Sequence, residues 1–468
     1  MPVRRPTTGR PALALVQAVS FAPPIQGHMV FRELKATLLL AVPLMAGQLG
    51  QMLMGLADTI MLGRLGPLEL AASSFANIIL WVPLVCGMGL MVAVSMRVSQ
   101  ARGAWQPEAA ATAVRHGIWL GLIVGVPTVL SLLALIPWLG DFGQPPDVAA
   151  AAPEFFVPVA LSVLPAVMTM ALKNFADAME QPWTAFWIGL GGIGLNVLLN
   201  WIFIFGHLGA PAWGLAGAGW ATLAARTATL LVMFAWVATT PAFQGWRPVH
   251  WWNRPHGPTL KRLLALGTPV SLGLLTEVGA FSMAGLMAGW LGTTSLAAHQ
   301  IALTCASVTF MIPLGLSMAT TVRIGACHGA NDHTRLRHIA IGSLAAGVGI
   351  MSLSATGFLA LGPTIASWFV TDPAVSGLAA RLLIIAGLFQ LFDGLQVTAS
   401  GVLRGMNDVR LPALLAGLAY WVLALPLAWI AAFPLHWKAE GIWVGLAIGL
   451  AAVSFALLAR IRHRLRAR

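Results

Sequence analysis

The sequence predicts an all-α polytopic membrane protein, with 12 transmembrane helices in two six-helix bundles that are related by a pseudo-two-fold axis along the membrane normal. Only 9% of the 468 residues are Asp, Glu, Lys or Arg, and 58% are hydrophobic. Soluble domains carry about 25% charged residues, so the main solvent of this chain is lipid. Long apolar spans alternate with short polar gaps, which is typical of membrane-crossing helices. The second half of the chain also repeats the first.

The apolar spans number twelve and are each long enough to cross a bilayer. We expect them at about 36–61, 68–96, 112–138, 155–178, 184–206, 214–238, 262–288, 295–322, 338–361, 378–401, 411–433 and 440–459.

The internal repeat has a constant offset of 226 residues, as Pro43 and Pro269 show. The same offset relates Leu34-Lys35 to Leu260-Lys261, and Gly103-Ala104 to Gly329-Ala330. Six spans in each half return the chain to the side from which it started, so the halves are parallel repeats, as in many secondary transporters. We therefore expect a leader at 1–33 that is disordered and cytoplasmic, an N-lobe at 34–239, a cytoplasmic linker at 240–260, a C-lobe at 261–460 and a basic cytoplasmic tail at 461–468.

The net charge of +12 comes mainly from Lys and Arg residues in the gaps on one side of the predicted spans. The gaps on the other side carry acids such as Asp141 and Glu440. An excess of Lys and Arg marks the cytoplasmic side, so both termini are expected to be cytoplasmic. The basic balance thus serves orientation in a lipid bilayer, and we expect no nucleic-acid partner.

Three carboxylates lie well inside predicted spans, namely Asp58, Glu277 and Asp393. A charge at the bilayer centre costs roughly 2.5–3.5 kcal/mol even on lenient scales, so such residues mark ion or proton pathways. The alternative is a neutral, protonated acid that is hydrogen-bonded to a neighbouring helix. The repeat places Gln51 opposite Glu277 and Ala284 opposite Asp58, so the scaffold is duplicated while the acids are not.

Polar residues in the first half accompany Asp58. Asn196 and Asn200 are four residues apart and share one helix face, and Thr222 lies at a similar membrane depth. An acid with amide and hydroxyl partners can take up and release a proton, although Asn196 and Asn200 could equally form ordinary interhelical hydrogen bonds. Arg226 is the candidate countercharge, and a structural pair with Asp58 would keep that acid ionised.

In the second half, Glu277 and Asp393 fall near the middle of the membrane. Two carboxylates at one cavity can share a proton, or offer oxygen ligands to a bare cation such as sodium. They also present negative charge to a lipophilic cationic substrate. No other metal site and no cofactor beyond the coupling ion is expected.

Several motifs in this order resemble the multidrug and toxic compound extrusion family, in its NorM-type branch. They are Ala57-Asp58-Thr59 with Gly63-Arg64-Leu65-Gly66, Leu195-Asn196 with Asn200-Trp201, Gly217 to Thr222, Glu277, and Gln390 to Asp393 followed by Gly401 to Asp408. The resemblance runs from about Phe31 to the end of the last span.

This resemblance implies a cation-coupled drug exporter of the bacterial inner (plasma) membrane. In similar proteins the positions of Asp58, Asn196, Asn200 and Thr222 form an N-lobe cation site. The positions of Glu277 and Asp393 form a C-lobe site that is linked to sodium or protons. Two differences bear on the coupling ion. Archaeal and DinF-like relatives carry an acid at the position of Asn200, so Asn200 fits the NorM-type branch better and argues against coupling to protons alone. The NorM-type sodium site uses a tyrosine at the position of Phe389, so this chain lacks one possible sodium ligand.

The expected function is therefore proton- or sodium-coupled antiport, in which a monomer exports small amphipathic cationic drugs or dyes as its two bundles rock. The alternative is a flippase for lipid-linked saccharides, which should line its cleft with Arg and Lys to bind pyrophosphate. An enzyme is not expected, because the sequence has no His-Glu-x-x-His, Gly-x-Ser-x-Gly or Walker motif.

Overall fold

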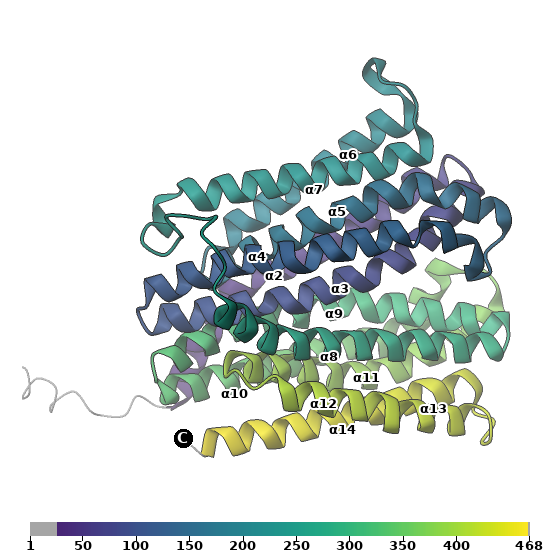
Figure 1. The fold of residues 1–468 in the computed structure, drawn as a ribbon. Helices are drawn as coiled ribbons and strands as arrows, with labels where there is room; N and C mark the ends of the chain where they lie inside the picture. Colours follow the sequence, from purple (N-terminus) through teal and green to yellow (C-terminus); the bar gives the residue numbers. More distant parts are fainter. Residues whose placement is uncertain (1–25, 467–468) are drawn as a thin grey trace, which may run out of the picture.

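The computed structural model describes residues 26–466, which are almost entirely helical (Figure 1). The first half contains α2 (Gln26–Gly63), α3 (Pro67–Gly103), α4 (Pro107–Ala134), α5 (Pro146–Ala178), α6 (Pro182–Phe205) and α7 (Gly214–Thr239). The second half contains α8 (Gly257–Trp290), α9 (Thr293–Gly329), α10 (His333–Phe369), α11 (Pro373–Gly405), α12 (Arg410–Leu418), the π-helix η4 (Ala419–Ala424), α13 (Leu425–Ala432) and α14 (Lys438–Arg466).

Twelve helical segments within the described residues are long and apolar enough to cross a membrane, with α12, η4 and α13 together forming one of them. They match the twelve expected spans one for one, and several extend further into the flanking polar gaps. Five helices begin at a proline, which lacks an N–H group and so suits the first turn; these are Pro67, Pro107, Pro146, Pro182 and Pro373.

Helix ends differ from the expectation at three places. α2 starts at Gln26, so residues 26–33 are helical where disorder was expected, while residues 1–25 of the expected leader lie outside the described residues. α8 starts at Gly257, inside the expected linker, and α14 continues to Arg466 in the expected tail.

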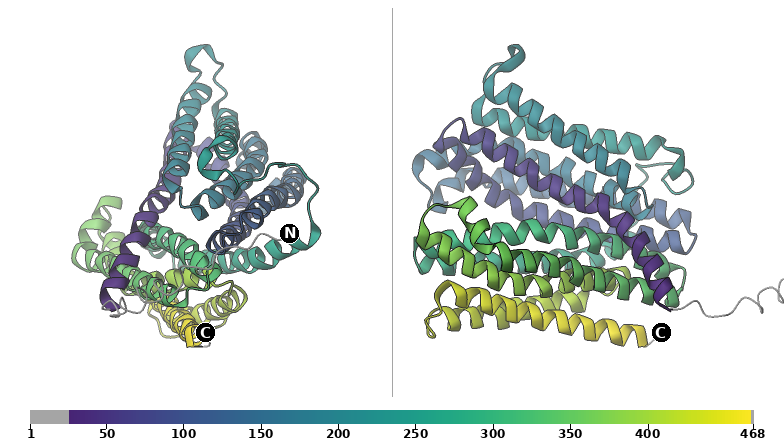
Figure 2. Two further views of the ribbon diagram at one scale, coloured as in Figure 1. Left: turned by 90° about the vertical axis from the view of Figure 1, so that its left-hand side faces the viewer. Right: turned by 180° about the vertical axis from the view of Figure 1, so that it is seen from behind.

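The start of α2 and the end of α14 lie at the same end of the helical bundle (Figures 1 and 2). We call this end the C-terminal face. The starts of α2 and α8 and the ends of α3, α9, α11 and α14 lie there, and the chain reverses at the opposite face between them.

Each half of the chain encloses its own hydrophobic core. One core consists of residues between Leu62 and Phe243 with Leu263, and the other of residues between Ala280 and Ile461. Because the two cores are separate, the protein consists of two bundles, as the repeat predicts.

The bundles touch through glycines that obey the repeat. A Cβ atom added to Gly103 would lie 1.9 Å from the carbonyl oxygen of Ala326, and one added to Gly329 would lie 2.0 Å from that of Gln100. The 226-residue offset exchanges these two contacts. Such reciprocity is what a two-fold axis requires, so α3 and α9 meet across the pseudo-two-fold axis at the C-terminal face.

A second reciprocal pair lies deeper between the bundles. Gly89 approaches the backbone of Ser271, and Gly315 approaches that of Met45, again related by the offset. These contacts are made by the first helix of each half, since Met45 is on α2 and Ser271 is on α8. Each leading helix therefore packs against the other bundle as well as its own.

The crossover falls near the paired prolines Pro43 and Pro269. Before Pro43, α2 packs on α9 through a small apolar cluster that includes Leu40 and Leu316. Beyond it, Gly50 contacts Ile193 of α6 in its own bundle. Proline removes a helical hydrogen bond, so both leading helices are weakened where their packing changes bundles.

Polar contacts complete the closure at the C-terminal face. Glu33 of α2 is 3% exposed and forms an ion pair with Arg323 of α9, while Arg335 Nε lies 3.1 Å from Glu33 Oε2. Arg323 Nη1 also donates to the Thr37 hydroxyl at 2.7 Å. The two bundles are therefore in direct contact at this face.

The glycine contacts predict a selective effect of added side-chain volume. Gly103→Ala and Gly329→Ala should each destabilise this closed arrangement by about 1–3 kcal/mol, because a methyl group has no room against a carbonyl oxygen. Alanine is the better helix former, so the loss has the opposite sign to that of helix propensity. Thermal unfolding of the purified protein, followed by tryptophan fluorescence, measures it.

Gly349→Ala is the matched control, since nothing lies within 4 Å of a Cβ added to Gly349. An equal fall in unfolding temperature for Gly349→Ala would contradict the role given to the two glycines.

Candidate functional site

The N-lobe candidates converge near the opposite face. Asp58 lies close to the end of α2, Asn200 close to the end of α6, and Thr222 close to the start of α7. Asn200 Nδ2 donates to Asp58 Oδ1 at 2.6 Å and to Asn196 Oδ1 at 3.2 Å. Asn196 Nδ2 in turn donates to the Thr222 hydroxyl at 3.3 Å. The structure thus connects Asp58, Asn196, Asn200 and Thr222 in one hydrogen-bonded chain.

This chain of amides ends on a partly accessible acid. Asn196 and Asn200 are fully buried, while Asp58 is half-buried. The Asn200 carbonyl oxygen Oδ1 has no hydrogen-bond partner within residues 26–466. One carboxylate and an unpaired amide oxygen therefore offer oxygen ligands to a cation.

Arg226 is one turn beyond Thr222 on α7, and it does not form an ion pair with Asp58. Its Nη1 donates to the Ser162 hydroxyl of α5 at 2.8 Å, and it interacts with Asp58 only electrostatically. The structure accordingly lacks the direct pair that would fix Asp58 in its ionised form. Ser162 has no distinguishing motif in the sequence, so its role could not be predicted.

The C-lobe candidates lie on two helices of the second bundle. Glu277 is in the middle of α8, and Asp393 is in α11 with 5% of its surface exposed. The charges of the two carboxylates are near enough to interact, and Glu277 is partly buried. The structure thus places both predicted C-lobe acids within electrostatic range of each other in the second bundle.

A tyrosine that sequence analysis missed completes this site. The Tyr420 hydroxyl lies 3.4 Å from Glu277 Oε1, and Tyr420 is fully buried. It belongs to the π-helix η4, a wide turn that directly precedes Pro426 in α13. Such wide turns recur at functional sites. The sequence did offer one signal, because Tyr420 is the only tyrosine in the chain.

Phe389 lies one turn before Asp393, and its ring is fully buried. It packs edge-on against Phe281 and Trp443, with centroid distances of 5.9 and 5.8 Å. Phe281 also lies beside Tyr420 at 6.3 Å. A cluster of aromatic rings therefore connects Phe389 to Tyr420, and the hydroxyl group near Glu277 comes from Tyr420 instead of residue 389.

Other polar groups line the interior of the second bundle. Gln390 Nε2 donates to the Thr309 hydroxyl, while its Oε1 has no partner among the described residues. Both ring nitrogens of the buried His299 also lack a partner in this part of the chain. Buried polar atoms are normally satisfied, so this interior has spare capacity to bind water or an ion.

Arg404 resembles Arg226 in its contacts, and it lies just beyond the expected tenth span. Its Nη2 donates to the Ser317 hydroxyl at 2.5 Å, and it interacts electrostatically with Glu277. Each bundle thus contains an acid and an arginine that interact electrostatically, while the arginine donates its hydrogen bond to a serine of the same bundle and forms no ion pair with that acid.

Comparison with known proteins identifies the family of the chain. The MatE family model matches residues 43–202 and 269–430. The two matches begin at Pro43 and Pro269, which are equivalent positions of the repeat.

Two curated relatives match over nearly the whole chain. "Probable multidrug resistance protein NorM" of Bradyrhizobium diazoefficiens is 38% identical, covering 93% of this chain and 94% of the relative. "Multidrug resistance protein PmpM" of Pseudomonas aeruginosa is 34% identical, covering 94% of each chain.

Solved structures share the fold. "Crystal structure of MATE in the bent conformation" has a TM-score of 0.86 at 23% identity, and covers 95% of this chain and 98% of its own. "Crystal structure of eukaryotic MATE transporter AtDTX14" has a TM-score of 0.84 at 20% identity, and covers 92% and 96%.

The expected resemblance is thus confirmed by the family model, by full-length relatives and by the fold. The chain is a multi-pass membrane transporter and not an enzyme, and it belongs to the MatE family.

Proposed function

We propose that this protein is a cation-coupled multidrug efflux antiporter, which exports amphipathic organic cations in exchange for protons or sodium ions. The observation that supports it best is the place of the acids. Asp58 and Glu277 each lie on a leading helix, in a site formed with its own bundle, and the same helix packs against the other bundle nearer the C-terminal face.

This placement couples ion loading to movement of the bundles. An ionised carboxylate needs water or a cation, whereas a neutralised one tolerates a dry interior. Loading of a proton or sodium ion at Asp58, or at Glu277 and Asp393, therefore changes which arrangement of the leading helices is favoured. A cationic drug competes for the same negative charge, so ion binding and drug binding exclude each other, and ion loading promotes drug release.

The energy supply depends on how many coupling ions enter in each cycle. One elementary charge that enters across 100 mV releases about 2.3 kcal/mol, but export of a monovalent cation across the same potential costs as much. One ion exchanged for one such drug therefore draws only on the concentration gradient of the ion, whereas a second coupling ion would add about 2.3 kcal/mol, or a substrate gradient of about fifty-fold.

We also propose that the protein resides in the bacterial inner membrane with its C-terminal face in the cytoplasm. The end of α14 alone carries Arg460, Arg462, Arg464 and Arg466 at this face, as the positive-inside rule requires. In this orientation the described conformation is closed toward the cytoplasm.

A flippase for lipid-linked saccharides is less well supported. It would need free arginines and lysines in the interior to bind pyrophosphate. The interior arginines Arg226 and Arg404 are instead hydrogen-bonded to serines of their own bundles, and the remaining interior charges at the two sites are acidic.

The acids of the second bundle are predicted to be essential. Glu277→Gln and Asp393→Asn should abolish drug resistance, because an amide of the same shape cannot take up the coupling ion. The measurement is growth of a drug-sensitive bacterial host on ethidium, with protein levels checked by immunoblotting. Glu440→Gln is the control, since Glu440 pairs with the exposed Arg381 at 2.9 Å away from both sites. Wild-type resistance in both acid variants would refute the assignment.

The coupling ion can be identified in liposomes. Purified protein should transport a fluorescent organic cation when a proton or a sodium gradient is imposed separately, and transport should follow at least one of them. If neither gradient drives transport by protein that still binds the dye, antiport is the wrong mechanism.

Tyr420 is predicted to tune the second site without being essential. Tyr420→Phe keeps the ring but removes the hydroxyl group near Glu277. A hydrogen bond of this kind contributes about 0.5–1.5 kcal/mol, so initial transport rates at limiting ion concentration should fall by roughly two- to tenfold. Phe281→Leu controls for packing in the same aromatic cluster. Unchanged ion dependence in Tyr420→Phe would exclude the hydroxyl group from the site.

A further inference from the structure

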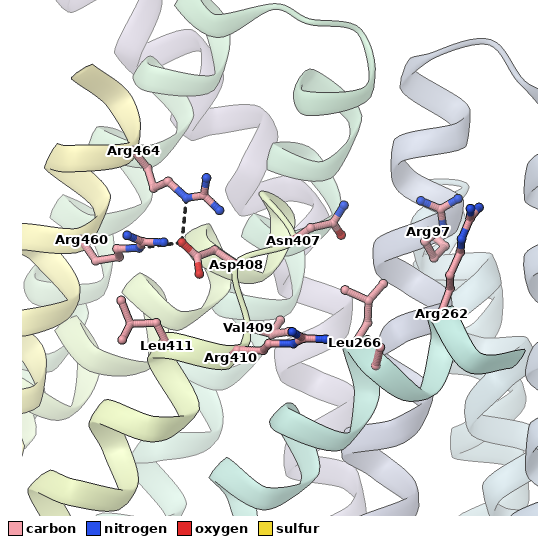
Figure 3. Close-up of a pocket in the computed structure, with 11 residues that line it drawn as sticks. Arg97, Arg262, Leu266, Asn407, Asp408, Val409, Arg410, Leu411, Arg460 and Arg464 are labelled. Carbon is pink, nitrogen blue, oxygen red and sulfur yellow. Dashed lines mark hydrogen bonds and ion pairs between the residues drawn. The ribbon is translucent and has the colours of Figure 1, made fainter. Parts of the chain in front are cut away.

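A strongly basic pocket lies at the C-terminal face, away from both acidic sites. It has a volume of about 540 Å³ and is lined by eleven residues of α3, α8, α12, α14 and the turn between α11 and α12. Five of these residues are arginines, and one is an acid; they are Arg97, Arg262, Arg410, Arg460, Arg464 and Asp408. Figure 3 shows Arg97 and Arg262 on one side of the pocket and Arg460 and Arg464 on the other.

The single acid does not neutralise the pocket. Asp408 Oδ2 accepts hydrogen bonds from Arg460 Nε and Arg464 Nε, each at 2.7 Å. Burial alone would raise the pKa of Asp408, but the hydrogen bonds and positive charges of the two arginines outweigh it and hold that pKa below its ordinary value of 3.8. Asp408 therefore stays ionised at physiological pH, and its stabilising contribution is lost only in acid, as the pH falls through that lowered value.

The remaining three arginines have no acidic partner. Arg97, Arg262 and Arg410 form no ion pair with any carboxylate of residues 26–466. Arg97 is half-buried, and its main charged neighbour is Arg262, which repels it. Like charges that are held together at a partly buried place indicate a missing anion.

The repeat allows the pocket at Arg97 to be compared with its equivalent in the other half of the chain. Arg323 is the counterpart of Arg97, and it lines a related pocket of about 470 Å³ on the other side of the pseudo-two-fold axis. That pocket contains its own anion, the carboxylate of Glu33, which is ion-paired with Arg323. The 226-residue offset places Thr259 at the position of Glu33. The pocket at Arg97 thus has the same arginine as the pocket at Arg323, but it has no carboxylate at the position of Glu33.

We propose that the pocket at Arg97, Arg262 and Arg410 binds the phosphate group of an anionic phospholipid. The planar guanidinium group donates paired hydrogen bonds that match phosphate oxygens. Basic pockets between transmembrane helices on the cytoplasmic side are suited to lipid headgroups. Leu266, Val409 and Leu411 supply an apolar lining for the glycerol end.

The bound lipid would stabilise the closed C-terminal face. Arg97 belongs to the first bundle, whereas the other pocket arginines belong to the second. A phosphate group between them replaces repulsion by attraction, as Glu33 does on the other side of the axis. A ligand that binds one conformation shifts the equilibrium toward it. Reversible binding of the lipid would therefore stabilise the contact between the two bundles.

The test is a titration of the detergent-purified full chain with dihexanoyl phosphatidylglycerol, read as the midpoint of thermal unfolding. The midpoint should rise in a saturable way, and dihexanoyl phosphatidylcholine, which has no net charge, should have little effect. In the double variant Arg262→Gln/Arg410→Gln, the half-saturating concentration should increase by at least about tenfold, because two charge-assisted contacts are lost. Arg262 and Arg410 are exposed, so the variant keeps its packing.

Arg337→Gln/Arg462→Gln is the matched control, since both arginines are exposed and lie outside the pocket. It removes the same charge and should titrate like wild type. Equal weakening in the two double variants would overturn the proposal, since it would show attraction to overall charge. A saturable rise with inorganic phosphate, but not with the lipid, would overturn the lipid as the ligand and assign the pocket to free phosphate.

Thr259→Glu is a complementary variant that adds the missing carboxylate. It should raise the unfolding midpoint without lipid and reduce the further rise on titration. A wild-type response in Thr259→Glu would contradict the comparison between the two pockets. In wild-type protein, a photoreactive headgroup analogue of phosphatidylglycerol should label residues 262–266 or 409–411, and labelling confined to other segments would refute the site.

Discussion

The cost of an ionised carboxylate in an apolar interior is the constraint on which this structure depends. Asp58, Glu277 and Asp393 lie inside bundles whose cores are otherwise alanine, leucine and aromatic rings. Asp58 accepts a hydrogen bond from Asn200, and Glu277 accepts one from Tyr420. None of the three acids forms an ion pair among residues 26–466. In the proposed mechanism this leaves the acids able to respond to the arrival of a cation, which a permanent ion pair would prevent.

The duplicated scaffold connects that response to movement of the two bundles relative to each other. The reciprocal contacts of Gly103 and Gly329 show that α3 and α9 meet through closely approaching backbones at the C-terminal face. Each bundle keeps its own extensive core, so its interior resists deformation more than the interface does. Movement is accordingly expected between the bundles, with the leading helices α2 and α8 bending where their packing changes sides.

Much of this could be predicted from the sequence, because hydropathy and the repeat depend on composition along the chain. The twelve spans follow from hydropathy alone. Counting residues along the helices places Asp58, Asn200 and Thr222 at a similar membrane depth, and the four-residue spacing of Asn196 and Asn200 places both on one face. The hydrogen bond between Asn200 and Asp58 is known only from the structure.

What the sequence could not show depends on how helices rotate against one another. Ser162 and Ser317 are single hydroxyl groups without a motif, yet they hold Arg226 and Arg404. Tyr420, whose hydroxyl group lies near Glu277, belongs to the π-helix η4, and neither feature has a sequence motif. Arg404 was left outside the tenth span because hydropathy falls before α11 ends at Gly405.

The asymmetry between the halves extends from the acidic sites to the C-terminal face. Glu33 closes one side of the pseudo-two-fold axis with a buried ion pair, whereas the equivalent side has adjoining arginines. A buried ion pair on both sides would mean that two pairs must break whenever this face opens, and loss of one partner from a buried pair costs about 3–5 kcal/mol. One elementary charge that crosses 100 mV is worth about 2.3 kcal/mol, which is less than the cost of a single such pair. A pocket that binds an exchangeable anion, as proposed above, closes the second side without adding a second internal pair to that cost.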